Sequence, residues 1–227
     1  KTTLFDVLSG HLAPASGRVV LLGQDVTRLR PEQRARLGLG RTFQQARLFP
    51  EMPLLDAMAV ALERAEPSEV VPSLLGLAPA RRAERAKAAR ASELLEMLGL
   101  DRYGHLHASE LSTGMRRLAE LGALVGLGAR VVLLDEPTAG IAQREVEAFS
   151  AVLRQVKDHL GATMVVVEHD MPLVASLVDR LYVLDAGQVL AEGPPAVLRD
   201  DPRVIAAYLG SDERMINRSG ALTGSQS

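Results

Sequence analysis

Two adjacent carboxylates follow an uninterrupted apolar run in the second half of the chain. The run is Val131–Leu134, and Asp135 and Glu136 come directly after it. Such a run predicts a buried strand, and open α/β sheets bind their ligands at the carboxyl ends of the strands. There, the first carboxylate could hold Mg²⁺ through water, and the second could orient or deprotonate a water that attacks a phosphate. An Asp-Glu pair also commonly just starts a turn, so both interpretations stay open for the pair alone.

The first three residues have the types that bind phosphate. Lys1-Thr2-Thr3 precedes a helical pattern that begins with Leu4 and Phe5, as the end of a G-x-x-x-x-G-K-[ST] loop precedes its helix. In that loop backbone N–H groups and the helix N-terminus hold phosphates, the lysine reaches the β- and γ-phosphates, and the hydroxyl binds Mg²⁺. The sequence would then begin inside the loop, and we expect the strands before it to lie outside this sequence.

Two further polar positions stand where an element is expected to begin or end. Ser112 and Gly114 precede or open a helical pattern, and the N–H groups at a helix start can bind an anion. A serine at this position is also an ordinary helix N-cap. His169 follows the apolar run Val165–Val167 and Glu168. It is therefore expected at the end of a second buried strand, where it could contact a phosphate or have a structural role.

Four short β-branched or aliphatic runs predict the strands that would position these groups. They are residues 17–22, 131–134, 163–167 and 181–184, each bounded by turn or polar residues. Between the second and third runs, Arg144–Leu160 has apolar residues at helical spacing and predicts an amphipathic helix. Strand, helix and strand in succession indicate a parallel α/β unit. After the fourth run, Asp185-Ala186-Gly187 predicts a hairpin that adds a small antiparallel element. The expected fold class is α/β.

The middle of the chain differs in composition and predicts helices. Residues 53–106 show little β signal and are rich in Ala, Leu, Glu and Arg. We expect a helical subdomain over residues 46–110, inserted into a core made of residues 1–45 and 111–210. The polar residues 211–227 are expected to form a flexible tail or linker.

Basic side chains cluster near the end of this helical region. They are Arg81, Arg82, Arg85, Lys87 and Arg90, with acidic Glu84 and Glu93 in the same segment. A nucleic-acid site would need aromatic stacking residues that the segment lacks, so we favour a solvated helix face. Two nearby histidines, His105 and His107, fall short of a metal-ligand set and are expected in a loop.

The bulk composition excludes several classes of protein. With 227 residues and 47% apolar content, the chain can form one large domain or a domain with a subdomain. Its 26 basic and 28 acidic side chains leave a net charge of −2, so no overall field draws it to nucleic acid or an anionic membrane. The absence of cysteine excludes disulfides and thiolate chemistry and fits a reducing cytoplasm. The longest nearly uncharged stretch is too short for a membrane helix.

One pentapeptide identifies a family. Leu111–Met115 reads L-S-T-G-M and resembles the L-S-G-G-Q signature of ATP-binding-cassette (ABC) ATPases. Arg41-Thr42-Phe43-Gln44 resembles the Q-loop of the same family, and His169 resembles its switch histidine. Together with Lys1 and the Asp135-Glu136 pair, these motifs follow the order that ABC ATPases use. The resemblance runs from Lys1 to about Gly210 and implies a P-loop NTPase core of the RecA type.

Two stretches are similar to a narrower group within this family. Gly40–Phe49 and Asp201–Gly210 resemble the ATPases of branched-chain amino-acid and urea importers. The resemblance therefore implies a subunit that hydrolyses ATP to drive the import of branched-chain amino acids or a similar small polar solute. Lipopolysaccharide-export ATPases are also similar, so an export ATPase is an alternative.

The resemblance also implies a role for each candidate residue. Lys1, Thr2 and Thr3 would bind the phosphates of ATP, and Ser112 and Gly114 of a second subunit would close over them. Mg²⁺ would be held by Thr2, Gln44 and Asp135. The catalytic group would be Glu136, as the base that acts on water, with His169 and Gln44.

The same resemblance implies partners. They are a second ATPase subunit, in a homo- or heterodimer, and integral membrane permease subunits, with no nucleic acid. The protein would then lie on the cytoplasmic face of the inner membrane as a peripheral subunit. The permease is expected near the Q-loop, where Phe43, Leu48, Phe49 and Met52 either form an apolar docking surface or pack internally.

Three positions depart from the family pattern. Thr113 stands where glycine is common, Met115 where glutamine is common, and Ala142 where many D-loops have aspartate. Two other functions stay open. A non-transport ABC ATPase that acts on ribosomes or DNA is expected to have tandem cassettes, a long coiled-coil insertion or a basic surface. None of these features is visible in this sequence. A chain without the glycine half of the phosphate loop could also bind partners without hydrolysing ATP.

Overall fold

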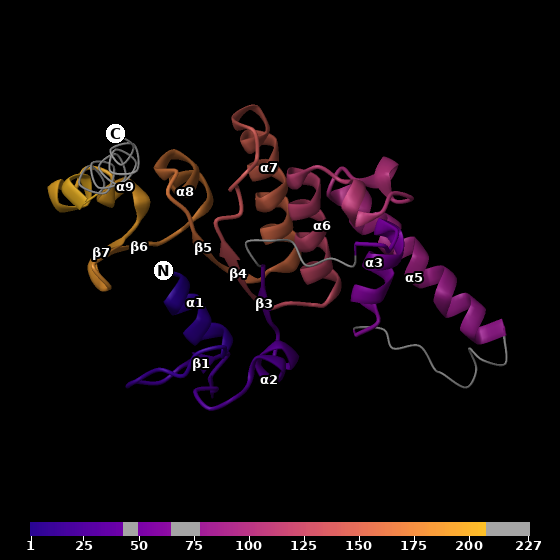
Figure 1. The fold of residues 1–227 in the computed structure, drawn as a ribbon, viewed down its shortest axis with the longest axis horizontal. Helices are drawn as coiled ribbons and strands as arrows, with labels where there is room; N and C mark the ends of the chain where they lie inside the picture. The colour runs from indigo at the N-terminus through magenta and orange to yellow at the C-terminus, as the bar shows by residue number, and fades with distance from the viewer. Residues whose placement is uncertain (43–49, 65–77, 208–227) are drawn as a thin grey trace, which may run out of the picture. The chain divides into compact units, whose positions relative to one another are not determined.

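The computed structural model describes residues 1–42, 50–64 and 78–207 (Figure 1). The chain divides into two compact units. The larger unit is Thr2–His169, and the smaller one comprises Lys1 and the described residues from Asp170 onward. Within the described residues, no helix has the length and apolar character needed to cross a membrane.

A three-stranded parallel sheet organises the larger unit. Its strands β3 (Leu39–Arg41), β4 (Val131–Asp135) and β5 (Thr163–Val167) lie in the order β3-β4-β5. The central strand β4 is the most buried, with Val132, Leu133 and Leu134 at most 1% exposed. Because all three strands run the same way, their carboxyl ends share one edge. The strands predicted at residues 131–134 and 163–167 are confirmed.

The strand β3 was not predicted, because glycine is depleted in strands and β3 has Gly40 at its centre. The structure gives a packing reason for this glycine. A Cβ atom at Gly40 would lie 3.0 Å from both Ala129 Cβ and Leu124 Cδ2. The face of β3 at Gly40 therefore has no room for a side chain.

Two long helices accompany the sheet. The helix predicted at 144–160 is confirmed as α7 (Gln143–Leu160), which connects β4 to β5 and ends at Gly161 in the left-handed conformation. It packs against α6 (Thr113–Gly126), as Figure 1 shows. The unit β4-α7-β5 is thus the expected parallel α/β arrangement.

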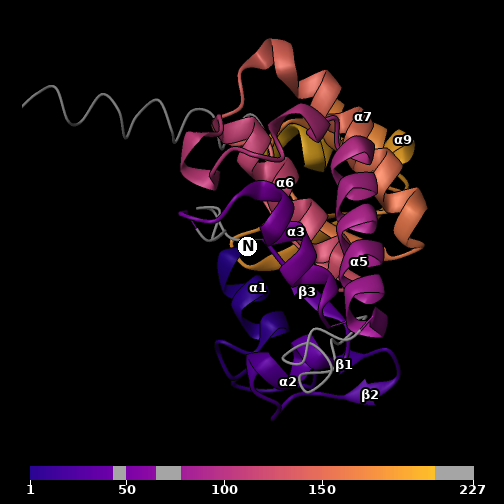
Figure 2. The ribbon, with the colours of Figure 1, turned by 90° about the vertical axis from the view of Figure 1, so that its right-hand side faces the viewer.

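The middle of the chain is helical, as predicted. It contains α3 (Leu54–Leu62), α5 (Ala78–Met97) and the short 3₁₀ helices η1 (Asp101–Tyr103) and η2 (Ala108–Glu110). α3 and α5 pack on each other and on α6 (Figure 2). Close packing is possible because α6 has glycines at this face: a Cβ atom at Gly126 would lie 3.1 Å from Ala61 Cβ. The boundaries of a helical subdomain at residues 46 and 110 stay predictions.

The basic face of α5 differs from the expectation at one residue. Arg82, Arg85 and Arg90 are exposed, but Lys87 is only 5% exposed and pairs with Glu63. The prediction of a solvated face was wrong for Lys87, because its ammonium group reaches an acidic partner just beyond the end of α3. The side chain of Arg81 lies outside the described side chains.

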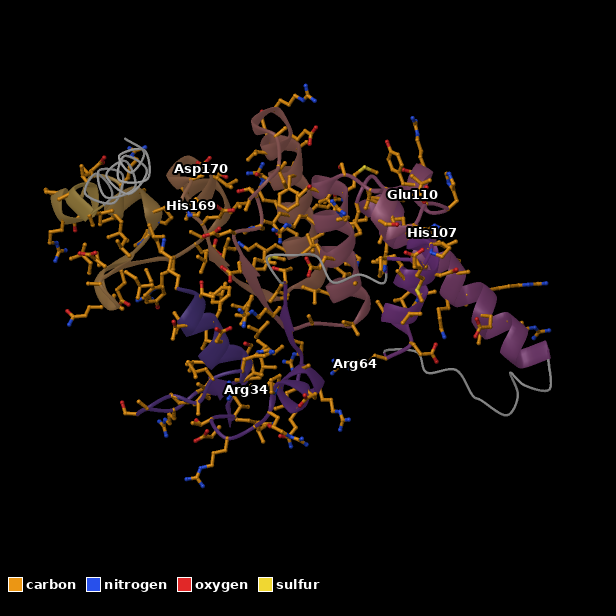
Figure 3. All side chains as sticks on the ribbon, in the orientation of Figure 1. Arg34, Arg64, His107, Glu110, His169 and Asp170 are labelled. Carbon is orange, nitrogen blue, oxygen red and sulfur yellow. The ribbon has the colours of Figure 1, made fainter. Side chains whose placement is uncertain are left out.

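The two histidines after η1 lie in a connecting segment, as expected. His107 precedes η2, and its backbone N–H group donates to Glu110 Oε2 at 2.7 Å (Figure 3). Among the residues that the structure describes, no cluster of three or more His, Cys, Asp or Glu side chains could hold a metal ion.

The first part of the larger unit holds α1 (Thr2–Ser9), a small hairpin and α2 (Pro31–Arg36). The hairpin pairs β1 (Val20–Leu21) with β2 (Gln24–Asp25), and its turn residues Leu22 and Gly23 both have positive φ. The strand predicted at 17–22 is therefore confirmed only for two residues. Gly17 has φ +83°, a turn conformation, so the strand begins only after this residue.

A buried arginine joins these elements. Arg34 of α2 is 1% exposed and donates to four backbone carbonyls, those of Val7, Leu8, Thr27 and Leu29, at 2.7 to 3.1 Å. Burial lowers the pKa of its guanidinium group. Two of the carbonyls belong to the last turn of α1, where a cation is favoured by the helix dipole. Arg34 thus holds the carboxyl end of α1 to α2 and to the connection between β2 and α2.

The smaller unit contains the second predicted hairpin. It comprises α8 (Met171–Leu177), β6 (Leu181–Asp185), β7 (Gln188–Gly193) and α9 (Pro195–Leu198). β6 and β7 are antiparallel, with Ala186 and Gly187 at positive φ in the turn, which confirms the predicted antiparallel element. Its core is Ala191, Leu198 and Val204, with Leu181 and Val183 packed against it. The expected tail, residues 211–227, lies outside the described residues.

Candidate functional site

The carboxyl edge of the parallel sheet brings together Asp135, Glu136 and His169. Asp135 ends β4 and is 3% exposed, whereas the side chains of Glu136 and His169 are 33% and 63% exposed. His169 Nδ1 lies 3.7 Å from Glu136 Oε1. The candidate base and the candidate switch histidine are thus neighbours, and both side chains are open to a ligand from solvent.

The backbone of Glu136 is held in an unusual conformation. Its φ is +47°, in the left-handed region, which costs a residue with a side chain about 1 to 2 kcal/mol. Two hydrogen bonds hold it there: the Glu136 N–H donates to Val167 O at 2.9 Å, and the Ala139 N–H donates to Glu136 O at 3.0 Å. No pattern in the sequence indicated this strain, and strained residues cluster at functional sites.

Arg41 connects Asp135 to the helix that follows Lys1. Its Nη1 lies 2.7 Å from both Asp6 Oδ1 and Ser9 Oγ of α1, and its Nη2 lies 3.9 Å from Asp135 Oδ2. The guanidinium group also lies 5.9 Å from the centre of the Phe5 ring. Arg41 appeared in the sequence only as part of the Q-loop resemblance. The structure shows that it orients α1 against the carboxylate at the end of β4.

Thr42 places the start of the Q-loop segment beside the same carboxylate. The residue is 4% exposed, its N–H donates to Leu133 O at 2.9 Å, and its Oγ1 accepts the N–H of Asp135 at 3.4 Å. Gln44, predicted as a catalytic and Mg²⁺-binding residue, lies outside the described residues, as does Phe43.

The residues predicted to bind phosphate stand at the start of α1. Thr2 and Thr3 form its first turn and are exposed. Lys1 is grouped with the smaller unit, so its contact with a phosphate stays a prediction. The chemistry of the donors suits Mg²⁺, which prefers carboxylate and hydroxyl oxygens. A site that combines Thr2 with Asp135 therefore also stays a prediction.

Ser112 is the N-cap of α6, as one of the two interpretations expected. Its Oγ accepts the N–H of Met115 at 3.3 Å, and the residue is exposed. Gly114 lies beside Ile141, in the segment Pro137–Ala142 that resembles the D-loop, and beside Glu145 of α7, because a Cβ atom at Gly114 would lie 3.9 Å from Ile141 Cγ2 and 3.8 Å from Glu145 Oε2. The anion-binding role of Ser112 and Gly114 stays a prediction.

The departure at Ala142 has a structural consequence that can be measured. Ala142 is the N-cap of α7 and has no side chain that could accept a hydrogen bond from the first turn. Ala142→Asp should raise the free energy of unfolding by about 0.5 to 2 kcal/mol, because a carboxylate can accept such a bond and favours the helix N-terminus. Urea unfolding would measure this, with Ala142→Asn to separate capping from charge. Equal stability of all three proteins would contradict it.

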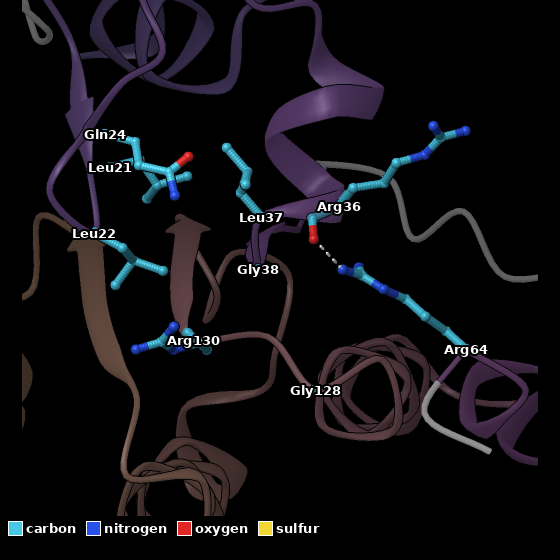
Figure 4. Close-up of a pocket in the computed structure, with 9 residues that line it drawn as sticks. All are labelled: Leu21, Leu22, Gln24, Arg36, Leu37, Gly38, Arg64, Gly128 and Arg130. Carbon is cyan, nitrogen blue, oxygen red and sulfur yellow. Dashed lines mark hydrogen bonds between the residues drawn. The ribbon is translucent and has the colours of Figure 1, made fainter.

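A cavity at the opposite edge of the sheet is separate from these groups. It has a volume of about 340 Å³ and lies where β3 and β4 begin, since Gly38 and Arg130 line it (Figure 4). Arg64 also lines it, but its guanidinium group donates to the backbone carbonyls of Ala35 and Arg36 at 2.7 and 2.6 Å. The carboxylates do not line this cavity, so we place the functional site at the carboxyl edge.

Two sequence families match the chain. The profile of the family "ABC transporter" matches residues 1–139, and that of "Branched-chain amino acid ATP-binding cassette transporter" matches residues 188–214.

Individual relatives match over most of their length. The high-affinity branched-chain amino acid transport ATP-binding protein LivG of Escherichia coli K12 is 36% identical, over 92% of this chain and 82% of LivG. The lipopolysaccharide export system ATP-binding protein LptB of Acidithiobacillus ferridurans is 32% identical, over 92% of this chain and 80% of LptB. These similarities agree with the family that the sequence motifs resemble.

Solved structures show the same fold. A structure of MJ1267, described as an ATP-binding cassette of an ABC transporter, has a TM-score of 0.73 and 30% identity, and covers 92% of this chain and 83% of MJ1267. The ADP conformation of MJ1267 matches with a TM-score of 0.67. The expected P-loop NTPase fold is confirmed.

Proposed function

Because the chain belongs to the ABC transporter family of ATP-binding proteins, we propose that it hydrolyses ATP to drive the import of branched-chain amino acids. Members of this family bind nucleotide and hydrolyse ATP. The import function is supported by the similarity to LivG and by the profile match over residues 188–214. One observation of the structure carries the proposal: Glu136 and His169 lie 3.7 Å apart beside the buried Asp135.

The roles of the residues follow from this geometry. Glu136 is the base that orients or deprotonates the attacking water, because its carboxylate is accessible and lies at the carboxyl edge of the sheet. The imidazole of His169, next to it, contacts the γ-phosphate. Asp135, Thr2 and Gln44 would hold Mg²⁺, which when bound would neutralise charge on the phosphates. Lys1 and Thr3, with Thr2, hold the phosphates at the start of α1.

The nucleotide is shared with a second subunit in this proposal. Ser112 and Gly114 stand at the start of α6, and Ser112 is exposed. Each subunit presents this helix start to the nucleotide held by its partner. Hydrolysis removes a bridge between the two surfaces, so the closed pair is no longer favoured. In the same proposal residues 1–45 and 111–210 form the nucleotide-binding core and residues 46–110 the helical subdomain.

The remaining partners are integral membrane permease subunits at the cytoplasmic face of the inner membrane. The docking surface would be near the Q-loop. Of the four apolar residues expected there, Met52 is half-buried in the structure, whereas Phe43, Leu48 and Phe49 lie outside the described residues.

Transport can be tested with the complex isolated from native membranes. The tagged full-length protein should co-purify with integral membrane subunits, and vesicles that contain the complex should take up labelled leucine, isoleucine or valine only when ATP is present. A matched complex with Glu136→Gln should show no uptake. Co-purification with ribosomes or DNA would contradict the importer function, and ATP-dependent extraction of lipopolysaccharide would favour export.

A further inference from the structure

The carboxylate of Glu168 accepts hydrogen bonds from two segments of the candidate site. Its Oε1 accepts the Thr138 N–H at 2.9 Å and the Thr138 hydroxyl at 2.6 Å. Its Oε2 accepts the N–H of His169 at 3.2 Å. Glu168 itself follows β5, and Thr138 belongs to the turn after β4. One carboxylate therefore joins the ends of two neighbouring strands.

Thr138 lies in the turn that Glu136 begins. This turn is closed by the bond from the Ala139 N–H to Glu136 O, and continues with the Ile141 N–H donating to Thr138 O at 3.0 Å. Its first residue is attached to the end of β5 by the bond from the Glu136 N–H to Val167 O. Thr138 and Glu168 provide a second attachment two residues later. The left-handed backbone of Glu136 lies between these two attachments.

We propose that Glu168 is a positioning residue, whose carboxylate holds the turn after Glu136 against the end of β5 and so keeps Glu136 and His169 side by side. This inference rests on the proposed function, because it assumes that Glu136 and His169 act together on ATP. Charge is part of the argument, since hydrogen bonds to a carboxylate are roughly twice as strong as neutral ones. Three donors face Glu168, and a carboxylate is acceptor-only, whereas a carboxamide would turn an N–H₂ group toward one of them.

The alternative, that Glu168 is itself the base, fits the contacts less well. Its two oxygens already accept from Thr138 and from the backbone of His169. Glu136, by contrast, has its carboxylate beside the imidazole ring of His169. Glu168 therefore acts through the position of Glu136 and does not touch the reacting atoms.

The first experiment measures kcat and KM for ATP in the full-length protein. Glu168→Ala should lower kcat by about 10- to 100-fold with little change in KM, because bonds to a charged group are lost while the groups that bind phosphate remain. Thr138→Val should lower kcat by a smaller factor, since the backbone donor remains, and Thr138→Ser should restore the parent value. The control is Glu192→Ala, which removes an exposed carboxylate paired with Arg180 and should leave kcat unchanged.

The double variant shows whether the effects on kcat of Glu168 and of Thr138 come from their mutual contact or are independent of each other. If Glu168 and Thr138 act as one pair, then adding Thr138→Val to Glu168→Ala should cost nothing further in kcat. Additive losses would contradict the proposal, and so would an unchanged kcat in Glu168→Ala.

The second experiment requires no catalysis. Amide hydrogen exchange in the nucleotide-free protein should show exchange of the Thr138 N–H at least about 10-fold faster in Glu168→Ala than in the parent or in Glu192→Ala. Unchanged exchange at Thr138 would contradict the attachment. If the parent protein failed to hydrolyse ATP, the proposed function would fall, while the exchange experiment would still decide whether Glu168 holds the turn.

Discussion

Replacement of Glu136 by glutamine should lower the kcat of ATP hydrolysis by a factor of about 10² to 10⁴, the usual contribution of a general base. Glutamine has nearly the same size, so the strained backbone and the packing of the turn stay as they are. It cannot take a proton from water, and it carries no charge to orient the neighbouring His169. Steady-state hydrolysis by the full-length protein, measured with a phosphate-release assay, would test this.

A matched control distinguishes the loss of the catalytic carboxylate from the loss of any other carboxylate of the protein. Glu147 is exposed on α7, and Glu147→Gln should hydrolyse ATP at the parent rate. The affinity of the Glu136→Gln variant for ATP should be close to that of the parent, because the phosphate-binding residues are untouched. If Glu136→Gln kept the parent kcat, the base would have to be another residue.

Replacement of Arg34 by methionine should lower the free energy of unfolding by about 4 kcal/mol, because four part-buried carbonyls each lose a donor, at a cost near the lower end of the usual range, about 1 kcal/mol each. Arg34 supplies donors to four carbonyls, and methionine supplies none. Lysine should recover only part of the loss, because one ammonium group cannot reproduce the planar fork of a guanidinium group. Equilibrium unfolding in urea would measure both differences.

The control for this prediction lies in the same helix. Arg36 is exposed, so Arg36→Met should change the free energy of unfolding by no more than about 0.5 kcal/mol. The same small effect from Arg34→Met would contradict the role of Arg34 as the anchor of α1. Because α1 carries Thr2 and Thr3, a loss at Arg34 should also weaken nucleotide binding.

The parts of the fold that the sequence predicted are those with a strong local pattern. β4, β5 and α7 have continuous or periodic apolar residues, and the β6–β7 turn has glycine at a position with positive φ. β3 lacks such a pattern because Gly40 interrupts it, and it is a strand because it pairs with β4, with Ala129 and Leu124 packed tightly against Gly40. The exposure of Lys87 was predicted wrongly for a similar reason, since its partner Glu63 is distant in sequence.

The candidate site shows the same division between local and distant causes. Asp135, Glu136 and His169 could be found from strand ends and motif order. The links made by Arg41 and Glu168 could not, because each joins segments that are tens of residues apart in sequence. The left-handed φ of Glu136 is a property of the turn and of its attachment to β5, and the residue type alone does not indicate it.

The absence of space at Gly40 limits how the chain can change in length. Arg41, the next residue in β3, contacts α1 through Asp6, so a shift by one residue would force a large side chain against Leu124 and would turn the guanidinium group away from α1. Gly38 adds a second restriction, since it has φ +101° and a Cβ atom there would lie 3.3 Å from Arg130. Insertions or deletions should therefore not be tolerated between Gly38 and Thr42. In a lineage of related proteins, this short segment would keep a constant length while the loops around it vary.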